Sequence, residues 1–185
     1  MPIPAAPPAP ELAGCDRGWW PIAAGQRYRW RVERTWYDGD TRTIRTVRAD
    51  RESVVTATPG RGAAARYTIT GWPEPWTDEL AATTIVEVDG THWSQGDPTD
   101  ARLSPWFELG RDAPAQPGAL LDREVTPAAA GKPAVLSLVW PAMVDDLTLQ
   151  LACGVGPVAL DYHHHGTRED LHAVRLPDKS AAGGP

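Results

Sequence analysis

RYRWRVERTWYDGDTRTIRTVRAD, residues 27–50, is the stretch that decides the fold. In its first half Tyr28 and Trp30 fall on one face, and the arginines at 27, 29 and 31 fall on the other. This alternation, with a period of two, is typical of a half-buried strand. Asp38-Gly39 then predicts a type I′ hairpin turn, and the segment after it is rich in Thr, Ile and Val, which favour strands. The stretch therefore predicts a long antiparallel hairpin.

The same kind of pattern continues to the end of the chain. Short apolar or alternating segments, separated by turn residues, predict further strands at 52–58, 64–70, 119–126, 134–140, 147–165 and 169–176, and a second hairpin at 83–93 around Asp89-Gly90. Two stretches rich in Pro and Trp, 71–82 and 94–119, break the pattern and predict long loops. Asp145-Asp146 predicts a turn. We find no internal repeat and no long amphipathic helix.

These elements predict an all-β protein with a single antiparallel sheet, strongly curved into a half-barrel, a barrel or a sandwich-like form. We expect a Pro/Ala-rich extended segment at 1–18, one antiparallel β domain at 19–177 and a disordered tail at 178–185. A chain of 185 residues suits one domain that buries a sizeable core.

Composition limits the class of function. The formal net charge of −6 argues against a general nucleic-acid binder, which needs a basic surface. No apolar run approaches the length of a membrane span, so we predict no transmembrane segment. Four of the nine tryptophans lie in or near the predicted loops, namely Trp72, Trp76, Trp93 and Trp106. Buried, they belong to the core; exposed together, they form a docking patch for a partner.

The two cysteines, Cys15 and Cys153, lie far apart in the sequence. Such a pair fits a disulfide in an exported protein, and the alternative is two free thiols. Leu12-Ala13-Gly14-Cys15 has the pattern of a lipobox, whose cysteine is lipidated in bacterial lipoproteins, so Cys15 is also a candidate lipid anchor. The residues before it lack the basic and apolar regions of a signal peptide, and such a tetrapeptide also occurs by chance.

The motifs WWPIAAGQRYRW, residues 19–30, and GVGPV, residues 154–158, resemble a loosely defined family of exported bacterial β domains. Those domains open with two aromatic residues, Pro, Leu and a spaced Gly-x-x-Trp-x-Tyr, often just after a lipobox-like cysteine. Positions 28 and 30 hold Tyr and Trp here, in exchanged order. The resemblance implies a curved antiparallel sheet, export to the bacterial cell envelope, periplasm or cell surface, and other envelope proteins as partners. It implies no activity.

Four of the five histidines lie in ALDYHHHGTREDLHAVRL, residues 159–176. On a strand, His163 and His165 share one face, whereas Tyr162 and His164 share the other. The run therefore divides its histidines between the two sides of a sheet.

The length of the following loop decides where the fourth of these histidines lies. A loop of two or four residues around 166–167 puts His172 on the face of His163 and His165, and a three-residue loop puts it with His164. Directly opposed residues have Cβ atoms about 5 Å apart, so imidazoles at such spacing can converge on one ion.

Imidazole suits copper, zinc and nickel, and a tetragonal set of nitrogens favours Cu(II). The His-x-His spacing resembles the strand element of copper superoxide dismutases, although no zinc signature is visible. The resemblance implies that His163 and His165 ligate copper, with His172 and His92 as further candidate ligands.

Charged neighbours complete this predicted site. By analogy with such enzymes, Arg168 and Arg175 are candidates for steering superoxide toward the metal, because a focused positive field raises the rate of encounter. Asp161, Asp170 or Glu169 are candidates for anchoring a ring N–H.

Two hypotheses of function follow. The first is a cell-envelope protein with a histidine copper site and superoxide dismutase-like activity. The second is a non-catalytic accessory or binding domain that docks through its aromatic loops, with histidines that are ordinary polar strand residues.

Overall fold

A computed structural model describes residues 15–59, 64–74, 81–99, 102–109, 121–166 and 169–177 of the chain. Within these residues the structure has eleven strands and no helix, and therefore no helix that is long and apolar enough to cross a membrane. The strands are β1 (Arg27–Asp38), β2 (Thr43–Thr58), β3 (Ala65–Trp72), β4 (Ala82–Asp89), β5 (His92–Gly96), β6 (Ser104–Glu108), β7 (Asp122–Thr126), β8 (Val135–Pro141), β9 (Asp145–Ala152), β10 (Gly156–His164) and β11 (Glu169–Arg175).

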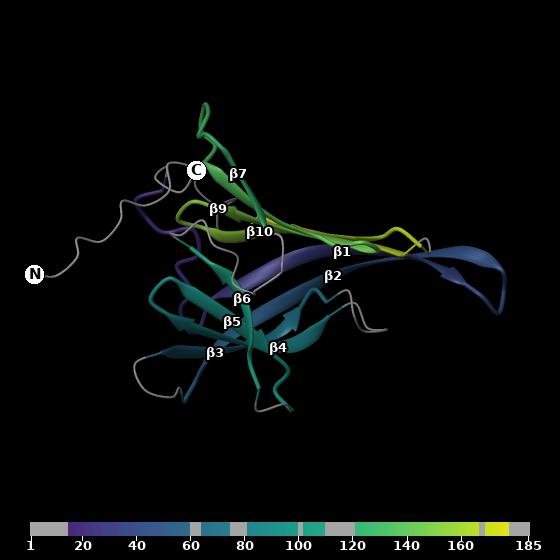
Figure 1. The fold of residues 1–185 in the computed structure, drawn as a ribbon, viewed down its shortest axis with the longest axis horizontal. Helices are drawn as coiled ribbons and strands as arrows, with labels where there is room; N and C mark the ends of the chain where they lie inside the picture. Colours follow the sequence, from purple (N-terminus) through teal and green to yellow (C-terminus); the bar gives the residue numbers. More distant parts are fainter. Residues whose placement is uncertain are drawn as a thin grey trace, which may run out of the picture.

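These strands form one antiparallel sheet in the order β6-β5-β4-β3-β2-β1-β11-β10-β9-β8-β7. β1 lies in the middle, because it pairs with β2 on one side and with β11 on the other. The arm formed by β3–β6 curls back toward the arm formed by β7–β10, and the β1–β2 hairpin extends beyond both (Figure 1). The all-β class and the strongly curved single sheet predicted from the sequence are confirmed, in the form of a half-barrel.

Aromatic side chains fill the concave side of the half-barrel. The Trp20 ring stacks on Trp93 with centroids 4.8 Å apart and on Trp72 at 5.6 Å. These three side chains and Trp106 are buried. Burying one large apolar side chain contributes roughly 2–3 kcal/mol, so this cluster is the centre of the core. The three loop tryptophans among them are core residues and form no exposed patch; Trp76 lies outside the described residues.

The predicted first hairpin forms, but its turn differs from the predicted one. Asp38 pairs with Thr43, so residues 39–42 connect β1 and β2 in place of a two-residue type I′ turn. The Asp38 carboxylate accepts hydrogen bonds from the backbone N–H groups of Asp40 at 2.9 Å and Thr41 at 3.2 Å. Aspartate commonly stabilises turns in this way, and here it favours the longer connection.

Two segments predicted to be irregular are strands. The loop predicted at 94–119 contains β6, and Pro105 is tolerated there because β6 is an edge strand. Asp145 and Asp146, predicted as a turn, begin β9 and pair with the two histidines that end β10. Both predictions are wrong for these residues, because pairing with a neighbouring strand outweighs the local preference of Pro and Asp.

A disulfide joins Cys15 to Cys153, with Cα atoms 5.4 Å apart, and confirms the predicted pairing. The link ties the N-terminal segment to the turn between β9 and β10, where the Gly154 N–H also donates to the Gly18 carbonyl at 2.9 Å. Residues 15–18 therefore belong with the sheet; the remainder of the predicted N-terminal segment and the predicted tail lie outside the described residues. A sulfur in a disulfide cannot also form the thioether of a lipid anchor, so the two predictions for Cys15 exclude each other.

Candidate functional site

The pairing of β10 with β11 assigns a face of the sheet to each histidine. Asp161 pairs with His172 and His164 pairs with Glu169, which excludes the register of a three-residue loop. Alternate residues of β10, such as the buried Tyr162, face the core on the concave side. His164 shares this side with Tyr162, whereas His163, His165 and His172 lie together on the convex face, the arrangement that the sequence predicts for a loop of two or four residues.

Each convex-face histidine contacts a carboxylate on a neighbouring strand. The pairs are His163 with Asp170, His165 with Asp146 at 2.8 Å, and His172 with Asp161. Asp170 thus contacts a ring nitrogen of His163, and Asp161 contacts one of His172. This is the anchoring role for which the sequence makes both aspartates candidates. The rings of His163 and His165 lie 4.8 Å apart between centroids and almost perpendicular, at 84°. Each carboxylate contact engages one ring nitrogen and leaves the second for another partner.

Other predicted site residues lie away from these histidines. His92 is on β5, in the opposite arm, with its Nε2 atom 3.5 Å from a carboxylate oxygen of Glu108. Arg175 holds its guanidinium 4.8 Å from the centroid of the Tyr28 ring, on the concave side. Arg168 lies outside the described residues. Within the described part of the chain, no group of three or more His, Cys, Asp or Glu side chains is arranged to hold a metal ion.

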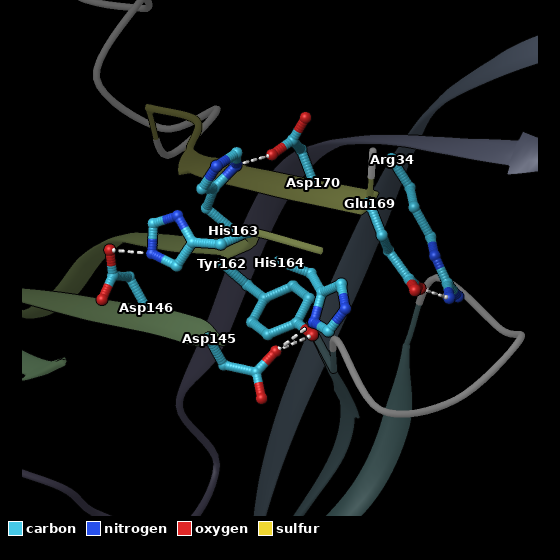
Figure 2. Close-up of polar contacts among 9 residues, drawn as sticks. Arg34, Asp145, Asp146, Tyr162, His163, His164, Glu169 and Asp170 are labelled. Carbon is cyan, nitrogen blue, oxygen red and sulfur yellow. Dashed lines mark hydrogen bonds and ion pairs between the residues drawn. The ribbon is translucent and has the colours of Figure 1, made fainter. Parts of the chain in front are cut away.

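A separate polar cluster lies on the concave side, where β9 and β10 meet the bend after β10. The Tyr162 hydroxyl donates to Asp145 Oδ1 at 2.7 Å, and His164 Nδ1 lies 2.6 Å from the same oxygen (Figure 2). The hydrogen bonds from His164 and Tyr162 hold the pKa of Asp145 below its ordinary value. Burial, together with the hydrogen bond to Asp145, raises the pKa of Tyr162. We call Asp145, Tyr162 and His164 the concave cluster.

An ion pair lies beside the concave cluster. Arg34 of β1 is buried, and its Nη2 atom donates to Glu169 Oε1 of β11 at 2.5 Å (Figure 2). Glu169 is the direct cross-strand partner of His164, so this pair and the concave cluster lie next to each other on one face. The Arg34–Glu169 pair is neutral as a whole, so it does not neutralise the negative charge of the Asp145 carboxylate.

A cleft of about 240 Å³ opens next to the concave cluster, between the ends of the two arms. Its walls are Gln95 of β5, Pro105 and Trp106 of β6, Trp140 of β8, Ala142 of the following turn, and Asp145 and Leu147 of β9. The two arms also contact each other through the rings of Phe107 and Trp140, whose centroids lie 6.2 Å apart. Aromatic groups from both arms and one carboxylate therefore line the same space.

Sequence reasoning placed Tyr162 and His164 on one face but did not assign them a role. The alternation along β10 was the available signal. The sequence does not indicate Asp145 as their partner, because Asp145-Asp146 predicts a turn and not strand residues that pair with Tyr162 and His164. No sequence pattern indicates the cleft, because Trp106 and Trp140 come together only through the curvature of the sheet.

No family model matches this sequence, and no curated protein is significantly similar to it. The resemblances drawn from the opening motif and from the His-x-His spacing therefore stay predictions.

Proposed function

We propose that this protein is a non-catalytic binding domain that holds an apolar group of its ligand in the cleft between its two arms. The observation that carries the proposal is that two indoles, Trp106 and Trp140, line the cleft from opposite arms of one sheet. Walls that are mostly apolar, with few polar groups, are typical of ligand sites. A volume of about 240 Å³ suits a ring or a short alkyl chain.

The polar groups beside the cleft favour binding over proton transfer. A general acid or base works best when its pKa lies near the working pH. The pKa of Asp145 is lowered and that of Tyr162 is raised, so both move away from neutrality. At neutral pH the carboxylate stays charged and the phenol stays protonated, which gives a fixed acceptor and a fixed donor.

The disulfide supports a place outside the reducing cytosol. Disulfides persist in secreted, periplasmic and cell-surface proteins and are rare in the cytosol. Together with the opening motif, the Cys15–Cys153 link supports a domain exported to the bacterial cell envelope, where it works beside other envelope proteins.

Binding of small uncharged probes tests the proposal. We expect n-hexanol and indole to bind with dissociation constants on the order of 1 mM, the range open to ligands of so few atoms. NMR signals of the Trp106 and Trp140 indole N–H groups should shift on titration, and Trp140→Ala should abolish the response. Ile44→Ala, at an exposed position of β2, is the control. Unchanged binding by Trp140→Ala would refute the proposal.

A transition-metal site on the convex face is a second candidate function. The observation that favours it is that each convex-face histidine has one ring nitrogen held by a carboxylate, the arrangement that commonly orients histidine ligands of metals. Nδ1 of His163 and Nε2 of His165 make these contacts, so Nε2 of His163 and Nδ1 of His165 are the nitrogens that would bind copper. The predicted superoxide dismutase-like activity depends on this binding.

Copper titration separates this candidate from the alternative of ordinary polar histidines. Wild-type protein should bind Cu(II) with nitrogen ligands visible by electron paramagnetic resonance. His163→Ala/His165→Ala should weaken binding at least about tenfold, the scale of losing ligands or their supports. His164→Ala, a neighbouring histidine on the opposite face, should leave the affinity unchanged. Equal affinity in all three proteins would remove the metal hypothesis and any enzymatic activity with it.

A further inference from the structure

The carboxylate in the cleft has an oxygen available for a ligand. Both hydrogen bonds to Asp145, from Tyr162 and from His164, end on Oδ1. Among the described residues, Oδ2 receives none, and about a quarter of the side chain, 27%, is exposed. Tyr162 and His164 fix the orientation of the carboxylate, so Oδ2 is held in place rather than free to rotate away.

The surroundings of Asp145 favour positive charge in the cleft. Arg34, the buried cation nearby, is already bound to Glu169. The other walls are uncharged, and two of them are indoles, whose faces attract cations more strongly than other aromatic rings do. An ammonium group that enters the cleft meets a carboxylate oxygen and indoles together, whereas a carboxylate ligand meets like charge.

We infer that the ligand is a small primary amine, in its ammonium form, on a short apolar stem. The stem packs against Trp106, Trp140 and Leu147, and the ammonium donates a hydrogen bond to Asp145 Oδ2. This inference rests on the proposed function, since it names the ligand class for the same cleft.

Three probes of equal stem length test the inference: n-hexylammonium, n-hexanol and hexanoate. We expect n-hexylammonium to bind wild-type protein about tenfold more tightly than n-hexanol, because a charge-assisted hydrogen bond adds to the apolar contact. Hexanoate should bind most weakly. Raising the salt concentration from low values to about 0.5 M NaCl should weaken n-hexylammonium binding and leave n-hexanol binding unchanged.

The chain offers a matched pair of variants. Asp145→Asn should reduce the affinity for n-hexylammonium to that for n-hexanol. Asp146→Asn makes the same change in charge at the adjacent residue, whose side chain contacts His165 on the convex face, and should have no effect. The salt series in wild-type protein gives the answer independently if Asp145→Asn does not fold.

The outcomes separate this inference from the proposed function. If n-hexanol binds in the cleft and n-hexylammonium binds no more tightly, the inference is wrong and the proposed function stands. Equal losses in Asp145→Asn and Asp146→Asn also contradict the inference, because they would reflect net charge and not a contact in the cleft. If none of the three probes binds, both the inference and the proposed function fail.

Discussion

The two faces of strands β9 and β10 carry the same residue types in different settings. On the convex face, Asp146 contacts His165, and 40% and 45% of these side chains are exposed. On the concave face, Asp145 contacts His164, with 27% and 25% exposed, and it also accepts a hydrogen bond from Tyr162. Figure 2 shows the two aspartates projecting from β9 in different directions. Adjacent residues of one kind therefore acquire different chemistry from the face they occupy, and of these four residues only Asp145 lines the cleft.

The largest effect on stability is expected from a comparison of two neighbouring residues on β11. Leu171 is buried on the concave face, and His172 is exposed on the convex face. Leu171→Ala should lower the free energy of unfolding by about 2–5 kcal/mol, because it leaves a cavity in the core. His172→Ala should change it by less than about 1 kcal/mol. Urea denaturation of both variants is the measurement, and similar losses would contradict the assignment of faces.

A smaller effect should come from the concave cluster itself. Tyr162→Phe removes a hydrogen bond to a carboxylate and should lower the free energy of unfolding by about 1–2 kcal/mol. The pKa of Asp145 should rise in this variant, since Tyr162 is one of the donors that lower it. Carboxyl carbon NMR across an acid titration measures the pKa of Asp145. An unchanged pKa would show that Tyr162 does not hold this carboxylate.

The smallest expected effect is a dependence of stability on pH. Because the pKa of Asp145 is lower in the folded protein than its ordinary value, its ionised form stabilises the fold above the pKa of the unfolded chain, and this contribution is lost as the pH falls through the folded pKa. Asp145→Asn should therefore lower the melting temperature at neutral pH, and the difference from wild type should shrink below about pH 4. Asp146→Asn, the matched control, should show a smaller difference at neutral pH.

The fold could be predicted well where one strand carries its own signal. The alternation of Tyr28 and Trp30 with arginines predicts β1, and paired turn signals predict the meander around it. The prediction failed where pairing with a neighbour decides the structure: Pro105 sits in an edge strand, and Asp145 begins β9 although both residue types disfavour strands.

The candidate site was predictable only in part for a related reason. Alternation along β10 assigns His163 and His165 to one face and His164 to the other, and the pairing agrees. Which groups approach from the other arm depends on the curvature of the whole sheet. The meeting of Trp106 with Trp140, and the distance of His92 from the other histidines, follow from that curvature and have no local signal.

The Cys15–Cys153 link also governs how the protein responds to mechanical load. The two cysteines are 138 positions apart, and every strand from β1 to β9 lies between them. A force applied to the two ends of the chain passes through the sulfur atoms. It therefore does not extend the segment between the cysteines and does not separate the strands of that segment from one another. Reducing the bond exposes the segment to tension and adds at least about 450 Å of extensible length at 3.3 Å per residue. Single-molecule stretching with and without reductant should show this additional length as one extension step that appears only when the disulfide is reduced.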